Sequence, residues 1–353
     1  MRRRSYLVAK MKKLKPERFT NAAVEVSILE KRLMTKANLE TILRAENFKQ
    51  VQGVLLTAGY RHFPSQSVGQ MNIHNLLNAY LADFFEELLA LVPEEETEFL
   101  DMLLLDFDVH NVQAALMQRE NGPSAASHTI AIPKSRHSFY ARRLAQREPE
   151  KGYFARLLDQ AEEQFAESPR VAQAWLDGEY YRRLSELAKE SGMGMFIDYA
   201  QAKADFFNLL TVLRMRGLHA RSGDVPAAMA VQLCAGLMAP GGSLSADFLT
   251  GLFSLNAEEI ERALEDTKYR RVFREGLSRY SYENDSALVE KEMDNYLTQL
   301  VAAKRYAVMG PETLFGYFYA RRIEVTNLRL VLAVRLQGMP EAAARERLRD
   351  LYV

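Results

Sequence analysis

The sequence predicts an all-α protein made of three similar helical domains. Apolar residues recur at steps of three and four along most of its 353 residues, which is typical of helices with one buried face. Signals for β-strands are scarce, and one helical pattern occurs three times. With 48% hydrophobic residues, a chain of this length can bury the cores of about two or three domains.

The first domain is predicted over residues 1–125. Between Met1 and Arg18 there are eight basic residues and one acid, which indicates a solvated helix face or a patch for an acidic partner or anionic lipid. Pro93 and the acids after it place negative charge at a helix start, where the helix dipole favours it. Between them a helix is predicted over 76–89, with Leu76, Leu77, Tyr80, Leu81, Phe84, Phe85, Leu88 and Leu89 on its buried face.

The second domain is predicted over 126–238, after small residues that run from Asn121 to Pro133. Ser168 and Pro169 are preferred residue types for the N-cap and first position of a helix. A loop is predicted over 217–226. The apolar stretch 225–239 is shorter than the roughly 20 residues that a membrane-spanning helix needs.

The third domain is predicted over 239–353, starting at the loop 240–243. Asn256 followed by Glu259 has the spacing of a capping box at a helix N-terminus. Another amphipathic helix is predicted over 288–300, where Leu288, Val289, Met293, Tyr296, Leu297 and Leu300 recur at helical steps.

An internal repeat is the most informative feature of the chain. Its copies lie at 99–119, 196–216 and 315–335, and each has a Phe followed nine positions later by an acid. An Asn follows three positions after the acid, with a Leu and an Arg five and eight positions after the Asn. The three sets are Phe99, Asp108, Asn111, Leu116 and Arg119; Phe196, Asp205, Asn208, Leu213 and Arg216; and Phe315, Glu324, Asn327, Leu332 and Arg335.

On a helix, the acid, Asn and Arg of each copy fall within roughly 80° of one another. Each copy therefore carries a polar stripe along one side of a long helix. Two interpretations remain open. The polar residues either hydrogen-bond within each domain and hold helix to helix, or they contact a partner protein directly.

The repeat extends beyond this motif. Residues 47–60 are similar in sequence to residues 256–269. Tyr80 precedes Phe99 by the same number of positions as Tyr296 precedes Phe315. The spacing between copies is about one hundred residues, which is too long for a solenoid repeat. A tandemly repeated helical domain is therefore predicted.

These features resemble the central-axis subunit of V-type and archaeal-type rotary ATPases, which is called the C subunit in prokaryotes and the d subunit in eukaryotes. The resemblance extends over essentially the whole chain. The first copy departs from it, since Val112 stands where the others have Leu after the Asn. The segments that carry it are Tyr6–Met11, Leu55–Tyr60, Trp175–Asp177, the three motif helices and, most specifically, Glu324–Gly338.

The resemblance implies a funnel of three helical domains around a pseudo-threefold axis. Such a protein lies on the cytoplasmic face of a membrane rotor ring of proteolipid subunits and receives the central stalk of the soluble ATPase head. It transmits torque for ATP-coupled H⁺ or Na⁺ transport and has no catalytic centre. Contact with the membrane is made only through the complex.

Composition and motifs add several exclusions. Lys plus Arg equals Asp plus Glu at 46, so nothing draws the whole chain to nucleic acid. Cys234 is the one cysteine, and the six histidines do not form a metal-ligand spacing with it or with each other. Phosphate-binding and dinucleotide-binding glycine motifs are missing too. We therefore expect no catalytic, cofactor-binding or metal-binding residue, and we expect Cys234 to be buried.

Two other classes of protein compete with the rotary adapter. One is an unrelated all-helical scaffold that binds peptides or proteins, and the other is an all-α enzyme without a familiar motif. A scaffold would bind its partner without any rotary component, whereas an enzyme would have a deep pocket with perturbed carboxylates or histidines.

Overall fold

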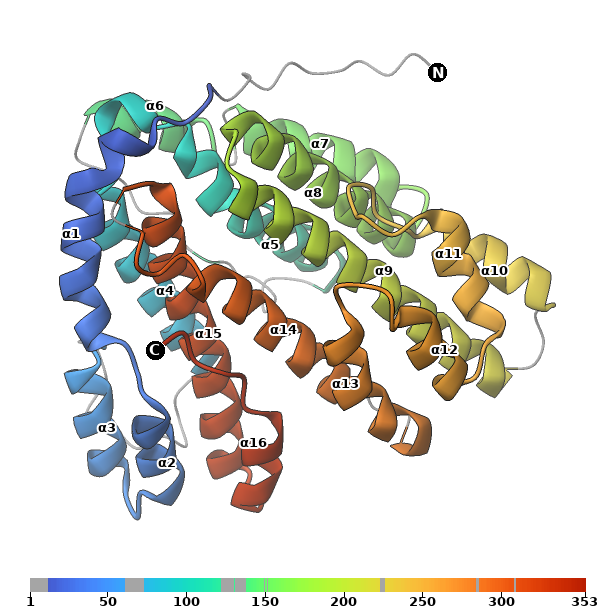
Figure 1. Ribbon diagram of the computed structural model, residues 1–353. Helices are drawn as coiled ribbons and strands as arrows, with labels where there is room; N and C mark the ends of the chain where they lie inside the picture. The colour runs from blue at the N-terminus through green and yellow to red at the C-terminus, as the bar shows by residue number, and fades with distance from the viewer. Residues whose placement is uncertain are drawn as a thin grey trace. The chain divides into compact units, whose positions relative to one another are not determined.

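A computed structural model describes residues 12–60, 73–121, 130, 138–148, 150, 152–222, 226–283, 286–307 and 309–353. Helices connected by short turns make up these ranges, which contain no β-strand (Figure 1). The all-α prediction is therefore confirmed. The opening segment Tyr6–Met11, most of 121–138 and His62, His128 and His137 lie outside the described residues.

The chain divides into two compact units, each assembled from three separate segments. Unit 1 contains 1–32, 71–197 and 305–321, and unit 2 contains 33–70, 198–304 and 322–353. Two of the repeat helices, α9 (Gly194–Ser222) and α15 (Pro311–Leu336), begin with residues of unit 1 and continue with residues of unit 2.

In unit 1, the repeat helix α5 packs against the antiparallel pair α7 and α8 (Figure 1). Ser168 caps α8 by accepting from the Val171 amide, as its sequence predicts, and Gly192 ends the helix with φ of 73°. The helices of this unit are α1 (Thr20–Leu29), α4 (Ile73–Leu89), α5 (Phe99–Asn121), α6 (Ser138–Ala145), α7 (Tyr153–Phe165) and α8 (Pro169–Ser191), with 3₁₀ turns at Pro16–Phe19, Glu30–Arg32 and Glu94–Glu96.

The phenylalanines of all three motif copies meet in the core of unit 1. The ring centroids of Phe99 and Phe196 are 5.9 Å apart, and those of Phe196 and Phe315 are 5.1 Å apart. Phe19 extends the row with an edge-on contact to Phe99 at 5.5 Å. Full burial of one such ring stabilises a fold by about 1.5–3 kcal/mol. The N-terminal parts of the three repeat helices thus share one aromatic core.

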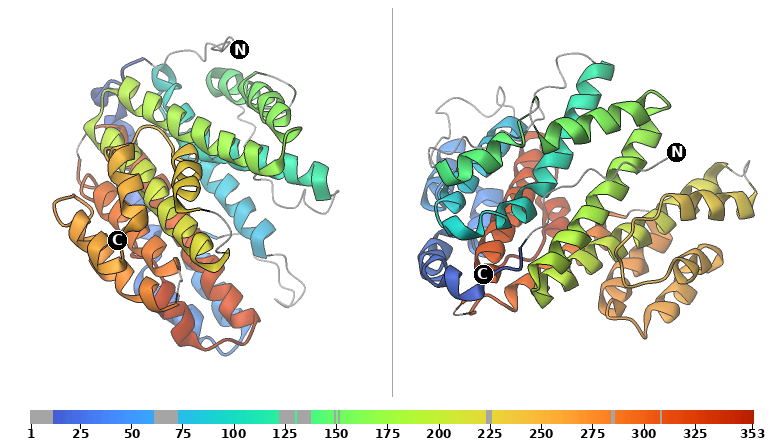
Figure 2. Two further views of the ribbon diagram at one scale, coloured as in Figure 1. Left: turned by 90° about the vertical axis from the view of Figure 1, so that its right-hand side faces the viewer. Right: turned by 90° about the horizontal axis from the view of Figure 1, so that it is seen from above.

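In unit 2, α13 packs against both α12 and α14, the orange helices of Figure 2. Asn256 and Glu259 form the predicted capping box at the start of α12. Thr35 and Asn38 form a second one at α2. The remaining helices of this unit are α2 (Lys36–Arg44), α3 (Phe48–Thr57), α10 (Ala227–Gly236), α11 (Ala246–Gly251), α12 (Ala257–Leu264), α13 (Arg270–Glu283), α14 (Ala287–Ala302) and α16 (Glu341–Arg347), with a 3₁₀ turn at Leu252–Ser254.

Two local predictions need correction. The predicted loop 217–226 is wrong in its first part, because α9 continues to Ser222 and the glycine at 217 is accommodated within the helix. The helix expected directly after Pro93 is a single 3₁₀ turn, and α5 begins only at Phe99. Cys234 is buried, as predicted. None of the described helices combines the length with the hydropathy that a membrane-spanning segment requires.

Candidate functional site: the repeated polar motif

The three motif asparagines make the same pair of hydrogen bonds. Each side chain donates to the carbonyl and accepts from the amide of one residue in the segment that follows its helix. For Asn208 and Ala239 these bonds are 3.0 and 2.7 Å, for Asn111 and Ile130 they are 2.9 and 2.8 Å, and for Asn327 and Arg349 they are 3.0 and 2.9 Å.

This pair of hydrogen bonds satisfies backbone groups that have no partner in a helix. A side-chain amide presents a donor and an acceptor side by side, so it pairs with a backbone that has no helical partner of its own. All three asparagines are buried, where an unpaired backbone amide or carbonyl would be costly. Each motif asparagine therefore fixes the chain leaving its repeat helix against that helix.

Two motif acids accept hydrogen bonds in matching ways. Asp205 accepts from the amides of Ser243 and Leu244 at 2.8 and 2.9 Å and from the Tyr269 hydroxyl at 2.5 Å. Glu324 accepts from the Met34 amide at 2.5 Å and from the Tyr60 hydroxyl at 3.1 Å.

The matching tyrosines occupy the ends of the two parallel segments 47–60 and 256–269. Burial and the bond to Asp205 both raise the pKa of Tyr269, so this phenol stays protonated and donates. The segment 33–60 is thus bound to α15 as 243–269 is bound to α9, although 264 positions separate Tyr60 from Glu324.

The first motif acid, Asp108, has a different partner. Its Oδ2 accepts from Nε of Arg147 at 3.1 Å, and Nη2 of the same arginine donates to Asp101 at 2.6 Å. The other oxygen, Oδ1, is buried and has no partner among the described residues. Burial and the nearby Asp101 raise the pKa of Asp108 to about 7, while Arg147 opposes this shift.

The three motif arginines differ in their surroundings. Arg216 donates to the carbonyls of Phe253 and Leu255, and Arg335 donates to the Leu43 carbonyl at 3.0 Å. These two arginines therefore hold the chain next to α12 and at the end of α2. Arg119 forms an ion pair with Glu162, but its side chain is 57% exposed.

The nine polar motif residues can be identified from the sequence, but not all of their partners can. The tyrosine at 60 and 269 is visible there as the last match of two parallel segments. Arg147 leaves no such signal, because it occurs in one copy only. No sequence spacing links Ser243 or Met34 to a motif acid.

The chemistry of this arrangement is structural. The donors and acceptors of the motif are mostly occupied by protein groups at hydrogen-bonding distance. Within the part of the chain that the structure describes, no group of three or more His, Cys, Asp or Glu residues is placed to hold a metal ion.

Known proteins similar to this chain align with nearly all of it. The C subunit of the A-type ATP synthase of Thermococcus gammatolerans is 22% identical over 360 aligned residues, which include 95% of this chain and 90% of that protein. The same protein of Methanocaldococcus jannaschii is 21% identical, with 96% and 87% of the two chains aligned. That of Methanosphaera stadtmanae is 19% identical, with 94% and 88% aligned.

The family model for the ATP synthase (C/AC39) subunit matches residues 22–347, which include all three motif helices and every one of the nine polar motif residues. The chain belongs to the ATP synthase (C/AC39) subunit family.

Proposed function

We propose that this chain is the non-catalytic rotor adapter of a rotary ATPase. It lies on the cytoplasmic face of the membrane rotor ring of proteolipid subunits and receives the central stalk. In this position it transmits torque for ATP-coupled H⁺ or Na⁺ transport. The observation that carries the proposal is the family match over residues 22–347, joined by relatives that are named as C subunits of A-type ATP synthases and align along nearly their whole length.

The internal contacts suit a part that transmits torque. Such a part must not deform under load, and closely packed helices have low compressibility. The buried asparagine bonds fix each repeat helix to the chain that follows it. The shared aromatic core holds the N-terminal parts of the three helices together.

We extend the proposal to three repeated domains in a pseudo-threefold funnel, with boundaries near 125 and 238. The recurrent asparagine pairing supports one module for each motif helix. The bonds from Met34 and Tyr60 to Glu324 support one refinement, in which residues 33–60 complete the module that contains α15.

In this role the chain acts as a binding partner and needs no catalytic residue, cofactor or metal. Its partners are the central stalk subunits and the proteolipid ring, and it meets the membrane only through the ring. Of the nine motif residues, Arg119 is the one we assign to partner contact, since more than half of its side chain is exposed.

The decisive experiment is reconstitution with purified partners. The chain should bind the isolated stalk subunits and, separately, a detergent-solubilised rotor ring, and should bridge the two in a single complex. Binding to neither would refute the adapter role. Tight binding to an unrelated helical peptide, with no affinity for stalk or ring, would favour the alternative of a protein-binding scaffold.

A further inference from the structure

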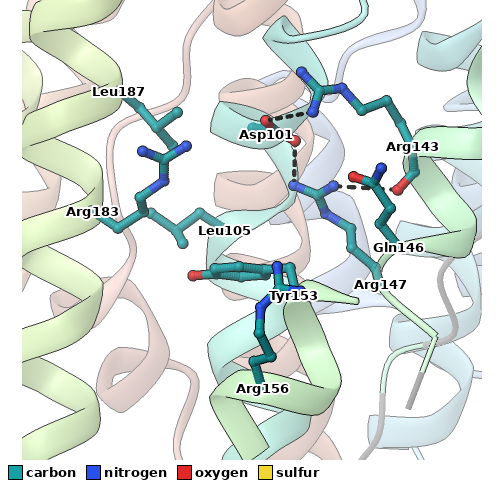
Figure 3. Close-up of a pocket in the computed structure, with 9 residues that line it drawn as sticks. All are labelled: Asp101, Leu105, Arg143, Gln146, Arg147, Tyr153, Arg156, Arg183 and Leu187. Atoms are coloured by element: carbon teal, nitrogen blue, oxygen red, sulfur yellow. Dashed lines mark hydrogen bonds and ion pairs between the residues drawn. The ribbon is translucent and has the colours of Figure 1, made fainter. Parts of the chain in front are cut away.

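A small pocket in unit 1 lies beside the first motif helix and is distinct from the stripes described above. It has a volume of about 40 Å³ and is bounded by α5, α6, α7, the α6–α7 connection and α8 (Figure 3). Its lining is rich in arginine and consists of Asp101, Leu105, Arg143, Gln146, Arg147, Tyr153, Arg156, Arg183 and Leu187.

Four arginines line this pocket, against a single acidic lining residue. Asp101 is shared between Arg147 at 2.6 Å and Arg143 at 3.4 Å. Arg147 also pairs with Asp108, which is not one of the residues that line the pocket. Arg143 comes within 3.7 Å of Glu98. The acids on this side of the pocket thus pair with Arg147 and Arg143, so the charge of these two arginines is largely compensated.

Arg183 is the key residue of the pocket. Its side chain is 6% exposed, and its Nη1 is 3.4 Å from Glu186 and 3.8 Å from Glu190. Its Nη2 is buried without a hydrogen-bond partner among the described residues. A buried cationic donor left unpaired is costly, so an acceptor that enters the pocket would remove a penalty already present in the fold.

Two other donors line the same pocket. Tyr153 directs its hydroxyl end toward the α8 side of the pocket, and Arg156 extends toward the Tyr153 ring (Figure 3). Burial raises the pKa of Tyr153, and Asp108 adds to the effect, so its phenol remains a donor. These groups offer guanidinium and hydroxyl hydrogens to an incoming acceptor.

We propose that this pocket binds a free tetrahedral oxyanion of the phosphate or sulfate class. The guanidinium fork of Arg183 matches the oxygens of such an ion, and its unpartnered Nη2 is a charged donor for one of them. A water molecule needs about 10–15 Å³ of such volume, so the pocket holds a few waters or one small ion and excludes a nucleotide. Arg183, Arg156 and Tyr153 are the ligating residues. This binding site goes beyond the adapter role and does not depend on it.

Isothermal titration calorimetry of the full chain tests the proposal, with phosphate, sulfate, acetate and chloride compared at equal ionic strength. Phosphate and sulfate should bind at one site, while acetate and chloride should give no saturable heat. Arg183→Gln should weaken phosphate binding by at least about tenfold, which is the loss expected for one charge-assisted hydrogen bond. Arg170→Gln is the control, because Arg170 is an exposed residue of α8 that does not line the pocket.

A second variant keeps the test decisive if Arg183→Gln fails to fold. Arg156 is exposed at the rim, so Arg156→Gln should fold normally and still weaken phosphate binding several-fold. Saturable binding that both variants retain would overturn the proposal, as would phosphate binding no tighter than chloride. Equal affinity for acetate would also overturn it, because the pocket would then be a carboxylate site.

Discussion

At the scale of single residues, each motif asparagine supplies the hydrogen bonds that a helix would otherwise give to a backbone amide and carbonyl. Asn208 pairs with both the amide and the carbonyl of Ala239, and its two counterparts do the same. An aspartate could accept but not donate, and a leucine could do neither, so the asparagine cannot be exchanged for a residue of similar size without leaving buried backbone groups unpaired.

Asn208→Ala should therefore lower the free energy of unfolding by about 2–4 kcal/mol, since two hydrogen bonds are lost and their backbone partners stay buried. Denaturant unfolding followed by circular dichroism measures this change. Asn21→Ala is the control, because Asn21 is an exposed residue of α1 and should change stability by less than about 0.5 kcal/mol. Equal effects of the two substitutions would contradict the assigned role.

The raised pKa of Asp108 predicts how the free energy of unfolding depends on pH. Its pKa is about 7 in the folded chain and near 3.8 in the unfolded chain, so between these values the folded state holds a proton that the unfolded state has lost. The free energy of unfolding contributed by this group therefore decreases as the pH rises through that window, and it is constant above it.

Asp108→Asn removes this titration while preserving the shape of the side chain. We expect the Tm of the variant, relative to the parent protein, to increase from about pH 5 to about pH 8. Differential scanning calorimetry over that range measures it. A difference in Tm that does not change with pH would show that Asp108 has an ordinary pKa in the folded chain.

At the scale of elements, the motif acids connect segments that are distant in sequence. Tyr269 and Tyr60 end equivalent segments, and each donates its hydroxyl to the acid of a repeat helix. The two copies thus share a tyrosine–acid hydrogen bond as well as residue types. One of its segments, 33–60, comes from the N-terminal part of the chain and is bound to the last repeat helix.

Tyr269→Phe and Tyr60→Phe should each destabilise the chain by about 1–3 kcal/mol, because a buried carboxylate loses a donor while packing is retained. Tyr306→Phe provides the matched control, since Tyr306 is 85% exposed. Thermal unfolding of the three variants gives the comparison. If both core variants melted like the control, the hydroxyl bonds would contribute nothing to stability.

The motif arginines separate internal from external roles. Arg216→Ala should destabilise the chain by about 1–3 kcal/mol, since two carbonyls lose their donor. Arg119→Ala should cost less than about 1 kcal/mol, as is usual for an exposed ion pair. Under the proposed function, Arg119→Ala should instead weaken partner binding in the reconstitution assay. If Arg119→Ala destabilised the chain and left partner binding unchanged, Arg119 would be excluded as a contact residue.

At the scale of the whole molecule, the three copies should behave alike. The amides of Ile130, Ala239 and Arg349 lie outside helices, yet each donates to a buried asparagine. Hydrogen exchange followed by NMR should show all three as slowly exchanging, whereas exposed loop amides exchange quickly. Asn208→Ala should release Ala239 alone. Fast exchange at any of the three in the parent protein would mean that the repeat is not structurally equivalent there.

Much of this could be predicted from sequence because the signals are local. Helix periods, the cap at Ser168 and the capping box at Asn256 depend on residues within one or two turns, and the structure has each of them. The motif residues can be recognised because the sequence holds three copies to compare. Arg147 cannot be recognised, because a partner present in only one copy leaves no pattern to compare.

Periodicity and spacing along the chain are enough to establish the helical class, the threefold motif and its nine polar residues. The tertiary structure alone decided which groups those residues bind, because a hydrogen bond between Tyr60 and Glu324 depends on how the whole chain returns on itself. It also brought Phe99, Phe196 and Phe315 together and buried one guanidinium nitrogen of Arg183 without a partner among the described residues. Spacing along a helix says which side chains share a face, whereas burial and packing say what that face meets.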